Sequence, residues 1–208
     1  MIAQVLPRLY LLTDRHQTVQ RSLDSVLTQA LGAGVRLLQI REKDLPTRDL
    51  CQLAQTLSPL FATHQAQWLI NDRVDLVLAL NASGVHLRTS SLPTGVVRQL
   101  LGPHRLIGVS THSHQEVLAA ERESADFAIL GPIFDTPSKR MYGQPLGLKA
   151  LERTCRTVQI PVFAIGGVTP DRVPELRKLG AYGVAVISSI LQAPDVFDTT
   201  QRFLDLLA

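Results

Sequence analysis

The sequence predicts an α/β fold, a single (β/α)8 TIM barrel of eight parallel strands, each followed by a helix. Two observations indicate this fold. Eight short apolar runs have the length of buried strands, and segments with helical periodicity separate them. In addition, each apolar run leads into polar or glycine residues. Because the strands of such a barrel end at one mouth, these residues are expected to form an active site there.

The expected elements alternate along the whole chain. Strands are predicted at residues 9–12, 37–38, 69–70, 85–87, 106–109, 127–130, 162–165 and 184–187. Helices are predicted at residues 19–31, 47–61, 74–80, 94–101, 114–123, 148–158, 170–179 and 196–207. Gly34, Gly102 and Gly180 follow three of these helices as stop signals, while Thr169 and Pro170 form a start signal.

Length and composition indicate one domain over residues 1–208. A chain of 208 residues that is 45% hydrophobic can bury one core and is short for a barrel, so its loops should be lean. No linker or low-complexity segment divides it. The one long connection, residues 134–147, is expected to be a lid or binding loop, with a variable surface loop as the alternative.

Charge and hydropathy argue against several classes of protein. The net charge of +3 is small and its basic residues are scattered, so nucleic acid is not expected as a partner. No apolar stretch approaches the roughly 18 residues of a membrane span, and no signal sequence is recognised, which indicates a cytoplasmic protein. Cys51 and Cys155 lack metal or disulfide spacing and are expected to be packing thiols. The sequence is compatible with a homo-oligomer.

Two small clusters near the C-terminus predict a phosphate site. Gly166-Gly167 follows the seventh expected strand and Ser188-Ser189 the eighth. Glycine lets backbone N–H groups approach an anion, and these two strand ends are where barrels commonly bind phosphate. The alternative is a tight turn that needs glycine, followed by a serine helix cap.

Cationic side chains gather after the second expected strand and on the long loop. Arg41 and Lys43 alternate with Glu42, so an extended segment would point both cations to one side, where they suit a diphosphate. Lys139 could close over the same group. The alternative is ion pairing, with Glu42 and Asp44 as partners.

An amide and a carboxylate follow the third expected strand. Asn71 and Asp72 could contact substrate and a magnesium ion, which at phosphate sites binds one or two carboxylates together with phosphate and water. The alternative is that they cap the helix that follows.

Two further side chains suit a substrate. His112 ends the fifth expected strand, where an imidazole could move protons, although a single histidine is often structural. Gln39 places an amide at the end of an apolar strand, where either a substrate heterocycle or the core must satisfy it. His86, within the fourth expected strand, is assigned a structural role.

Motifs taken in order over nearly the whole chain resemble the thiamin phosphate synthase/TenI superfamily. They are Tyr10-Leu11-Leu12-Thr13-Asp14, Gln39-Ile40-Arg41-Glu42-Lys43, Ile70-Asn71-Asp72-Arg73, Gly84-Val85-His86-Leu87, Gly108-Val109-Ser110-Thr111-His112, the run from Gly131 to Lys139, and Ala164-Ile165-Gly166-Gly167. The resemblance implies a barrel enzyme that joins a hydroxymethylpyrimidine diphosphate to a thiazole phosphate and releases pyrophosphate with Mg²⁺.

The resemblance also implies a role for each matching residue. Gln39 would contact the pyrimidine and Asp72 the metal. The diphosphate would be bound by Arg41, Lys43, Asn71, Ser110 and Lys139. The thiazole phosphate would be bound by Thr136, Ser138, Gly167, Ile187 and Ser188. Cations and metal would stabilise the negative charge that develops on the departing diphosphate.

One motif departs from the family pattern. The synthases usually continue with Gly-Gln, any residue and a second magnesium-binding Asp, whereas this chain has Arg88-Thr89-Ser90-Ser91. Ser91 favours the related TenI-type thiazole tautomerases, which need no metal and in which His112 would shuttle a proton. Gln39 and Asp72 favour the synthase, which is the leading interpretation. A non-catalytic barrel that binds thiamin precursors is a third hypothesis.

Overall fold

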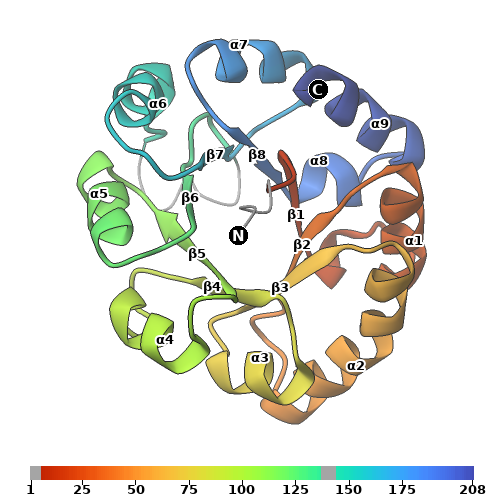
Figure 1. Ribbon diagram of the computed structural model, residues 1–208. Coiled ribbons are helices and arrows are strands. Elements are labelled where there is room, and N and C mark those ends of the chain that lie inside the picture. The colour runs from red at the N-terminus through yellow and green to blue at the C-terminus, as the bar shows by residue number, and fades with distance from the viewer. Residues whose placement is uncertain (1–5, 137–143) are drawn as a thin grey trace.

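The computed structural model describes residues 6–136 and 144–208, and its eight strands confirm the predicted barrel. All neighbouring strands are parallel, and β1 pairs with both β2 and β8, so the sheet closes (Figure 1). The strands are β1 Leu9–Leu12, β2 Leu37–Ile40, β3 Gln67–Asn71, β4 Gly84–Leu87, β5 Leu106–Thr111, β6 Phe127–Leu130, β7 Val162–Ile165 and β8 Gly183–Val186.

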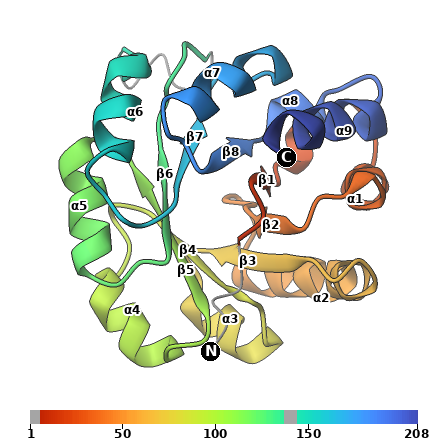
Figure 2. The same cartoon turned by 45° about the horizontal axis from the view of Figure 1, so that its top comes forward.

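The helices surround the barrel, as the tilted view in Figure 2 shows. They are α1 Leu23–Ala33, α2 Thr47–Thr63, α3 Val74–Leu80, α4 Thr94–Leu101, α5 His114–Arg122, α6 Gly147–Cys155, α7 Val173–Lys178, α8 Ser188–Leu191 and α9 Val196–Leu207, with short 3-10 turns at Arg15–Gln17 and Pro170–Arg172. None of these helices is both long and apolar enough to cross a membrane.

Two helix predictions need correction. The first helix begins at Leu23 rather than at residue 19, because Val19 and Gln20 adopt left-handed backbone with φ of 51° and 62°. The short helix α8 was not predicted at all, since four residues are too few to show a helical period. It follows β8 directly and therefore helps to form the mouth of the barrel.

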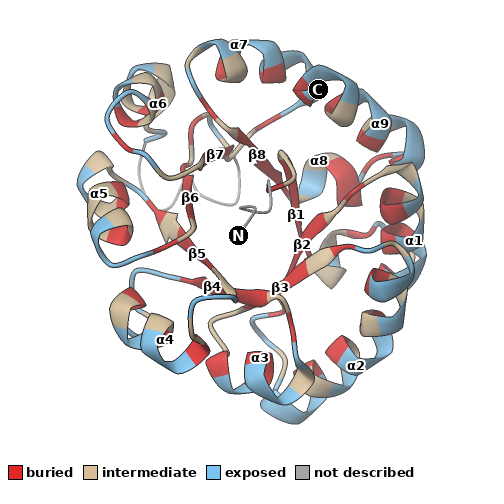
Figure 3. Cartoon of the chain, viewed as in Figure 1, coloured by how far each residue is buried: buried red, intermediate tan, exposed pale blue. Residues whose placement is uncertain are grey.

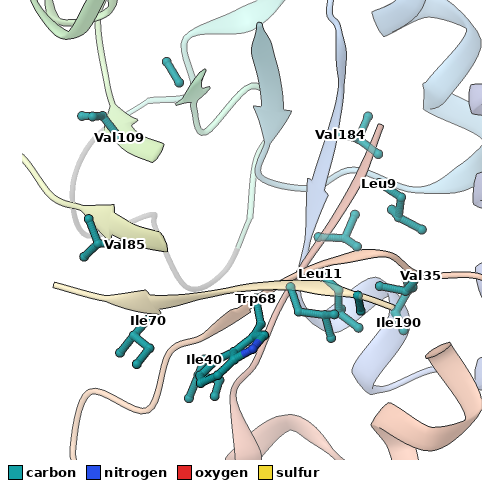
Figure 4. Close-up of a cluster of buried hydrophobic side chains, with 14 of the residues drawn as sticks. Leu9, Leu11, Val35, Ile40, Trp68, Ile70, Val85, Val109, Val184 and Ile190 are labelled. Carbon is teal, nitrogen blue, oxygen red and sulfur yellow. The ribbon is translucent and has the colours of Figure 1, made fainter. Parts of the chain in front are cut away.

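Side chains alternate between two cores along each strand. Outward-facing residues such as Leu9, Leu11, Ile70 and Val85 join the layer between strands and helices, part of which Figure 4 shows. Inward-facing residues fill the barrel itself, with Tyr10, Leu12, Leu37, Leu69, Phe127, Ile129, Phe163 and Ala185 in one cluster. The strands are buried while the outer helix faces are exposed (Figure 3).

The same alternation brings polar residues into the barrel near its mouth. Gln39 lies two residues after the inward-facing Leu37, and Ser110 pairs with the inward-facing Ile129. His86 pairs with Asn71 on one side and Gly108 on the other. A Cβ atom on Gly108 would lie 2.6 Å from the imidazole Nδ1 of His86, so glycine makes room for this ring.

Both cysteines are half-buried free thiols. Burial raises the pKa of Cys155 to about 11, so this thiol stays protonated and unreactive near neutral pH. This agrees with the prediction of a packing role for Cys155.

Candidate active site

A cavity of about 130 Å³ opens at the mouth of the barrel, over the carboxyl ends of the strands. The loops after β5, β6, β7 and β8 supply most of its lining. The predicted site residues that line it are Arg41, Ser110, His112, Thr136, Gly167, Ile187 and Ser188. Residues far apart in the sequence therefore meet at the position that the barrel topology predicts.

Other predicted site residues lie beside this cavity or outside the described part of the chain. Lys43 is exposed and absent from the lining, because β2 ends at Ile40 and the chain turns after Glu42. Asn71 is half-buried at the end of β3. Ser138 and Lys139 lie outside the described residues.

Gln39 is a completely buried amide without a protein partner. Its Oε1 and Nε2 atoms are both free of hydrogen bonds, and the residue has no exposed surface. Leaving a buried polar group unsatisfied costs about 1–3 kcal/mol. The alternative of a satisfied core amide is therefore wrong for this residue, although Gln39 is not among the residues that line the cavity.

A buried hydrogen-bond chain links the barrel interior to the cavity. The hydroxyl of Tyr10 lies 3.3 Å from Nδ1 of His86, and Nε2 of His86 lies 2.9 Å from the hydroxyl of Ser110. Burial lowers the pKa of His86 to about 3, so its ring is neutral near pH 7. His86 is structural, as predicted, but it also fixes the position of Ser110 in the cavity wall.

His112 presents one ring nitrogen for proton transfer. Its Nδ1 lies 2.6 Å from the carbonyl oxygen of Gly131. Since a carbonyl only accepts, Nδ1 must carry the hydrogen, which leaves Nε2 of the neutral ring as a base. The backbone N–H of His112 donates to the carboxylate of Glu116, which anchors this residue at the end of β5.

The β7 and β8 loops form the opposite wall of the cavity. Gly166 and Gly167 have φ of 94° and 63°, and a Cβ atom on Gly167 would lie 2.7 Å from the carbonyl oxygen of Asp135. Both left-handed backbone and close approach therefore require glycine here. Ser189 donates to the carbonyl of Val168, which ties the start of α8 to the β7 loop, while Ser188 remains in the cavity lining.

Arg41 is the cation at the base of the mouth. Burial lowers the pKa of Arg41 below its usual value. The negative charges of Asp14 and Glu42 work to raise this pKa, and the positive charge of Arg88 lowers it further. Its backbone N–H donates to the hydroxyl of Thr13, 2.9 Å away, which anchors the start of this loop to β1.

Glu42 and Asp44 bind Arg15, which sequence reasoning missed. Glu42 is buried and accepts from the hydroxyl of Thr13 at 2.6 Å and from Arg15 at 3.1 Å. Asp44 accepts from Arg15 and lies 3.1 Å from the ring of His16. Arg15, from the segment after β1, is therefore a partner of both acids that the sequence alternative did not name, while the charge of Glu42 also acts on Arg41.

Asp72 is held by two side chains from the loop after β4. Arg88 forms an ion pair with its Oδ2 atom, and the hydroxyl of Ser91 donates to its Oδ1 atom. Burial works to raise the pKa of Asp72, but the hydrogen bonds from Ser91 and Arg88 outweigh burial and lower it. Asp72 does not cap α3, since Arg73 precedes that helix and makes no side-chain cap, so the capping alternative is wrong.

Arg88 itself carried no sequence prediction of a role. Its position directly after a strand is the signal that could have identified it, because strand ends form the mouth. Arg88 and Ser91 line a second hollow together with Ser110 and Thr111, which also line the main cavity. The second hollow extends between α4 and α5, where Thr94 and Ala119 line it, so the two hollows meet at the end of β5.

The sequence of this chain matches a family model and several known proteins over most of its length. Residues 9–190 match the family model described as thiamine monophosphate synthase. A Geobacter sulfurreducens protein, to which the name thiamine-phosphate synthase has been given provisionally, is 48% identical over 199 residues, or 96% of this chain and 93% of the relative. The thiamine-phosphate synthase of Roseiflexus castenholzii is 39% identical over 199 residues, or 96% and 87% of the two chains.

A solved structure shares both fold and sequence with this chain. The thiamine phosphate pyrophosphorylase from Pyrococcus furiosus superposes with a TM-score of 0.87 at 34% identity, over 96% of this chain and 95% of the other. The likeness extends over the whole barrel, so it includes every strand end that forms the mouth.

Proposed function

This chain belongs to the thiamine monophosphate synthase family, and on that premise we propose that it joins a hydroxymethylpyrimidine diphosphate to a thiazole phosphate. It is a transferase that releases pyrophosphate and forms thiamin phosphate. The observation that carries this proposal is the unpaired, fully buried amide of Gln39 near a cationic mouth. An aminopyrimidine has a ring nitrogen that accepts and an amino group that donates, which match the two ends of an amide.

The reaction needs charge stabilisation rather than a base. The bond between the methylene carbon of the pyrimidine and the diphosphate oxygen breaks, and its electron pair leaves with pyrophosphate. The thiazole nitrogen gives its lone pair to that carbon and becomes positively charged. Since this nitrogen carries no proton, the enzyme has only to orient two substrates and stabilise the leaving group.

Each wall of the mouth suits one of the two anions. Arg41 and Ser110 would bind the diphosphate, and Gly167 and Ser188 the thiazole phosphate. The same proposal assigns Lys43, Asn71 and Lys139 to the diphosphate and Thr136, Ser138 and Ile187 to the thiazole phosphate. With the two anions bound in this way, the reacting carbon and nitrogen would meet between the two binding regions.

The residues around Asp72 do not fit the magnesium site that the family resemblance implies. Both carboxylate oxygens of Asp72 already accept hydrogen bonds, from Ser91 and Arg88. Ser91 offers a hydroxyl where a second carboxylate would be expected. The described residues contain no group of three or more His, Cys, Asp or Glu side chains that could hold a metal ion. The mechanism above therefore assigns no step to a metal bound at Asp72.

A second candidate function is the tautomerisation of a thiazole carboxylate phosphate. The hydrogen bond from Nδ1 of His112 to Gly131 favours it, because this bond leaves Nε2 free to take and return a proton at the cavity wall. The loss of the second acidic residue at Ser91 favours it as well. In this reaction a proton moves between carbon and base, so His112 would be essential.

The substitution Gln39→Met tests the proposed coupling most sharply. Methionine fills a similar volume without polar atoms, so the variant should be more stable by about 1–2 kcal/mol, because an unsatisfied buried amide is removed. Coupling should fall about 100-fold, since the pyrimidine loses its hydrogen bonds. Thiamin phosphate formation and urea unfolding measure the two effects.

The matched control is Gln55→Met on the exposed face of α2, which should change neither coupling nor stability by much. Full coupling activity in the Gln39→Met enzyme would refute the assigned role of Gln39 and remove the main support for the proposed function.

A further inference from the structure

The loop after β4 differs from the family pattern at two positions that face the same carboxylate. Arg88 and Ser91 both bind Asp72, one at each oxygen. The backbone N–H of Arg88 also donates to the hydroxyl of Ser91 at 2.8 Å, so Ser91 links the two ends of this loop. The three residues form one connected group, which we call the Asp72 cluster.

The charge of the Asp72 cluster is balanced without an added ion. Relative to the family pattern, Ser91 removes one negative charge and Arg88 adds one positive charge. Together the two changes supply two positive charges, which is the charge of a single divalent cation. The remaining pair of Asp72 and Arg88 sums to zero.

The Arg88 guanidinium also has donors left for a ligand. It carries five N–H groups, and its side-chain bond to Asp72 uses one nitrogen. The side chain is 42% exposed and lines the hollow that contains Ser110. Its charge is close enough to Arg41 to lower the pKa of that residue. Arg41 lines the main cavity and Arg88 the second hollow, and Ser110 lines both, so the two cations lie on either side of Ser110.

We propose that the guanidinium of Arg88 takes the place of a divalent cation at Asp72 and, with Arg41, binds the diphosphate of the substrate directly. Asp72 then acts as a positioning residue that orients Arg88, and Ser91 fixes the carboxylate. A planar guanidinium can bind two phosphate oxygens at once, so it can neutralise the leaving group. This inference rests on the proposed coupling function and explains how the reaction proceeds without a metal at Asp72.

Binding of inorganic pyrophosphate, measured by isothermal titration calorimetry, tests the proposal. The wild-type protein should bind pyrophosphate in EDTA. Arg88→Met should weaken this binding at least tenfold, and Arg88→Lys should weaken it less because it keeps the charge. Arg156→Met is the matched control, since Arg156 is 74% exposed and pairs with Glu152 on α6. It should bind pyrophosphate like the wild type.

Rebuilding the family pattern provides the opposite test. The double variant Arg88→Gly, Ser91→Asp places two carboxylates together, so it should bind Mn²⁺ in the absence of pyrophosphate, as seen by electron paramagnetic resonance, and should need Mg²⁺ to bind pyrophosphate. The wild-type protein should not bind Mn²⁺ under the same conditions. That last measurement needs no variant and therefore does not depend on how a variant folds.

Two results would overturn the proposal: stoichiometric Mn²⁺ binding by the wild-type protein, or pyrophosphate binding by a folded Arg88→Met protein that equals the wild type in EDTA. A coupling assay run alongside separates this inference from the proposed function. Absence of thiamin phosphate under all conditions would refute the coupling function, whereas the pyrophosphate titration would still decide the role of Arg88.

Discussion

The two sides of the barrel mouth differ in how their polar groups are paired. On the β7 and β8 side, Gly167 and Ser188 line an open cavity. The left-handed backbone at Gly167 sets the shape of this wall of the cavity. On the β3 and β4 side, Asp72 is already bound by Arg88 and Ser91. Under the proposed function the first side would receive an anion, while on the second side Arg88 already balances the charge of Asp72.

The two sides therefore depend on different kinds of structure. The open side depends on a glycine with left-handed backbone conformation and on close backbone packing. Few other residues can replace glycine at such a position. The paired side depends on side chains in a single loop after β4, which can change without altering a strand. Four predictions test the comparison. Two concern Arg41 and Gly167, one for each of the two anions, and two concern His86 and His112.

The largest expected effect follows from Arg41→Met. Removing a half-buried cation from the diphosphate region should lower coupling about 1000-fold, because such donors stabilise charge that develops on the leaving group. Thiazole phosphate affinity should change less than about twofold, since that anion binds the other wall. Steady-state coupling and equilibrium binding of thiazole phosphate measure the two quantities.

The control for this variant is Arg105→Met. Arg105 precedes β5 at the opposite end of the barrel, where it donates to Asn81, so coupling should be unchanged. An equal loss of thiazole phosphate binding in Arg41→Met would mean that the two sides are not separate sites.

The second effect concerns the open side. Gly167→Ala should weaken thiazole phosphate binding about 100-fold, because alanine meets both left-handed strain and a 2.7 Å contact with the carbonyl oxygen of Asp135. Pyrophosphate binding should be retained. Calorimetry with each anion separately checks both statements, and a parallel loss of the two affinities would contradict them.

The third effect is on stability in mild acid, through His86, a buried residue of β4. The pKa of His86 is about 3 in the folded protein, against roughly 6.5 in an unfolded chain. Below pH 6.5 the unfolded chain gains a proton that the folded protein does not, so stability falls as the pH drops toward 3. The loss should be about 2 kcal/mol at pH 5.

Urea unfolding at pH 7.5 and pH 5 measures this loss, and His86→Gln should remove that part of the pH dependence. If the variant keeps the full wild-type pH dependence, His86 is not the residue responsible.

The smallest effect is expected for His112→Asn in coupling. The coupling reaction moves no proton from the thiazole nitrogen, so its rate should change less than about threefold. Conversion of the thiazole tautomer, if this protein catalyses it, should be lost completely. A coupling rate that falls about 100-fold would show that His112 has a role that the proposed mechanism does not contain.

Much of the fold could be predicted because strand length and helical period are local properties. All eight strands were expected, and helices α3, α4 and α9 begin and end where predicted. The start of α1 was wrong because the left-handed backbone at Val19 and Gln20 leaves no clear sequence signal. The collection of Arg41, His112 and Ser188 in one cavity followed from barrel topology alone.

The partners of charged residues could not be predicted in the same way. The sequence places Glu42 beside Arg41 and Lys43, yet Glu42 binds Arg15 from another loop. Likewise, Arg88 and Asp72 are sixteen positions apart and meet only because β3 and β4 are neighbours. Such pairs depend on the three-dimensional approach of loops, which spacing along the chain does not determine.

The most direct test of the central claim is a coupling assay with the purified wild-type protein. Pyrimidine diphosphate and thiazole phosphate are supplied together, in Mg²⁺ and in EDTA, and the thiamin phosphate formed is measured. The structure predicts product in both conditions. No product in either condition, while the protein still converts the thiazole tautomer, would contradict the coupling function and identify a tautomerase.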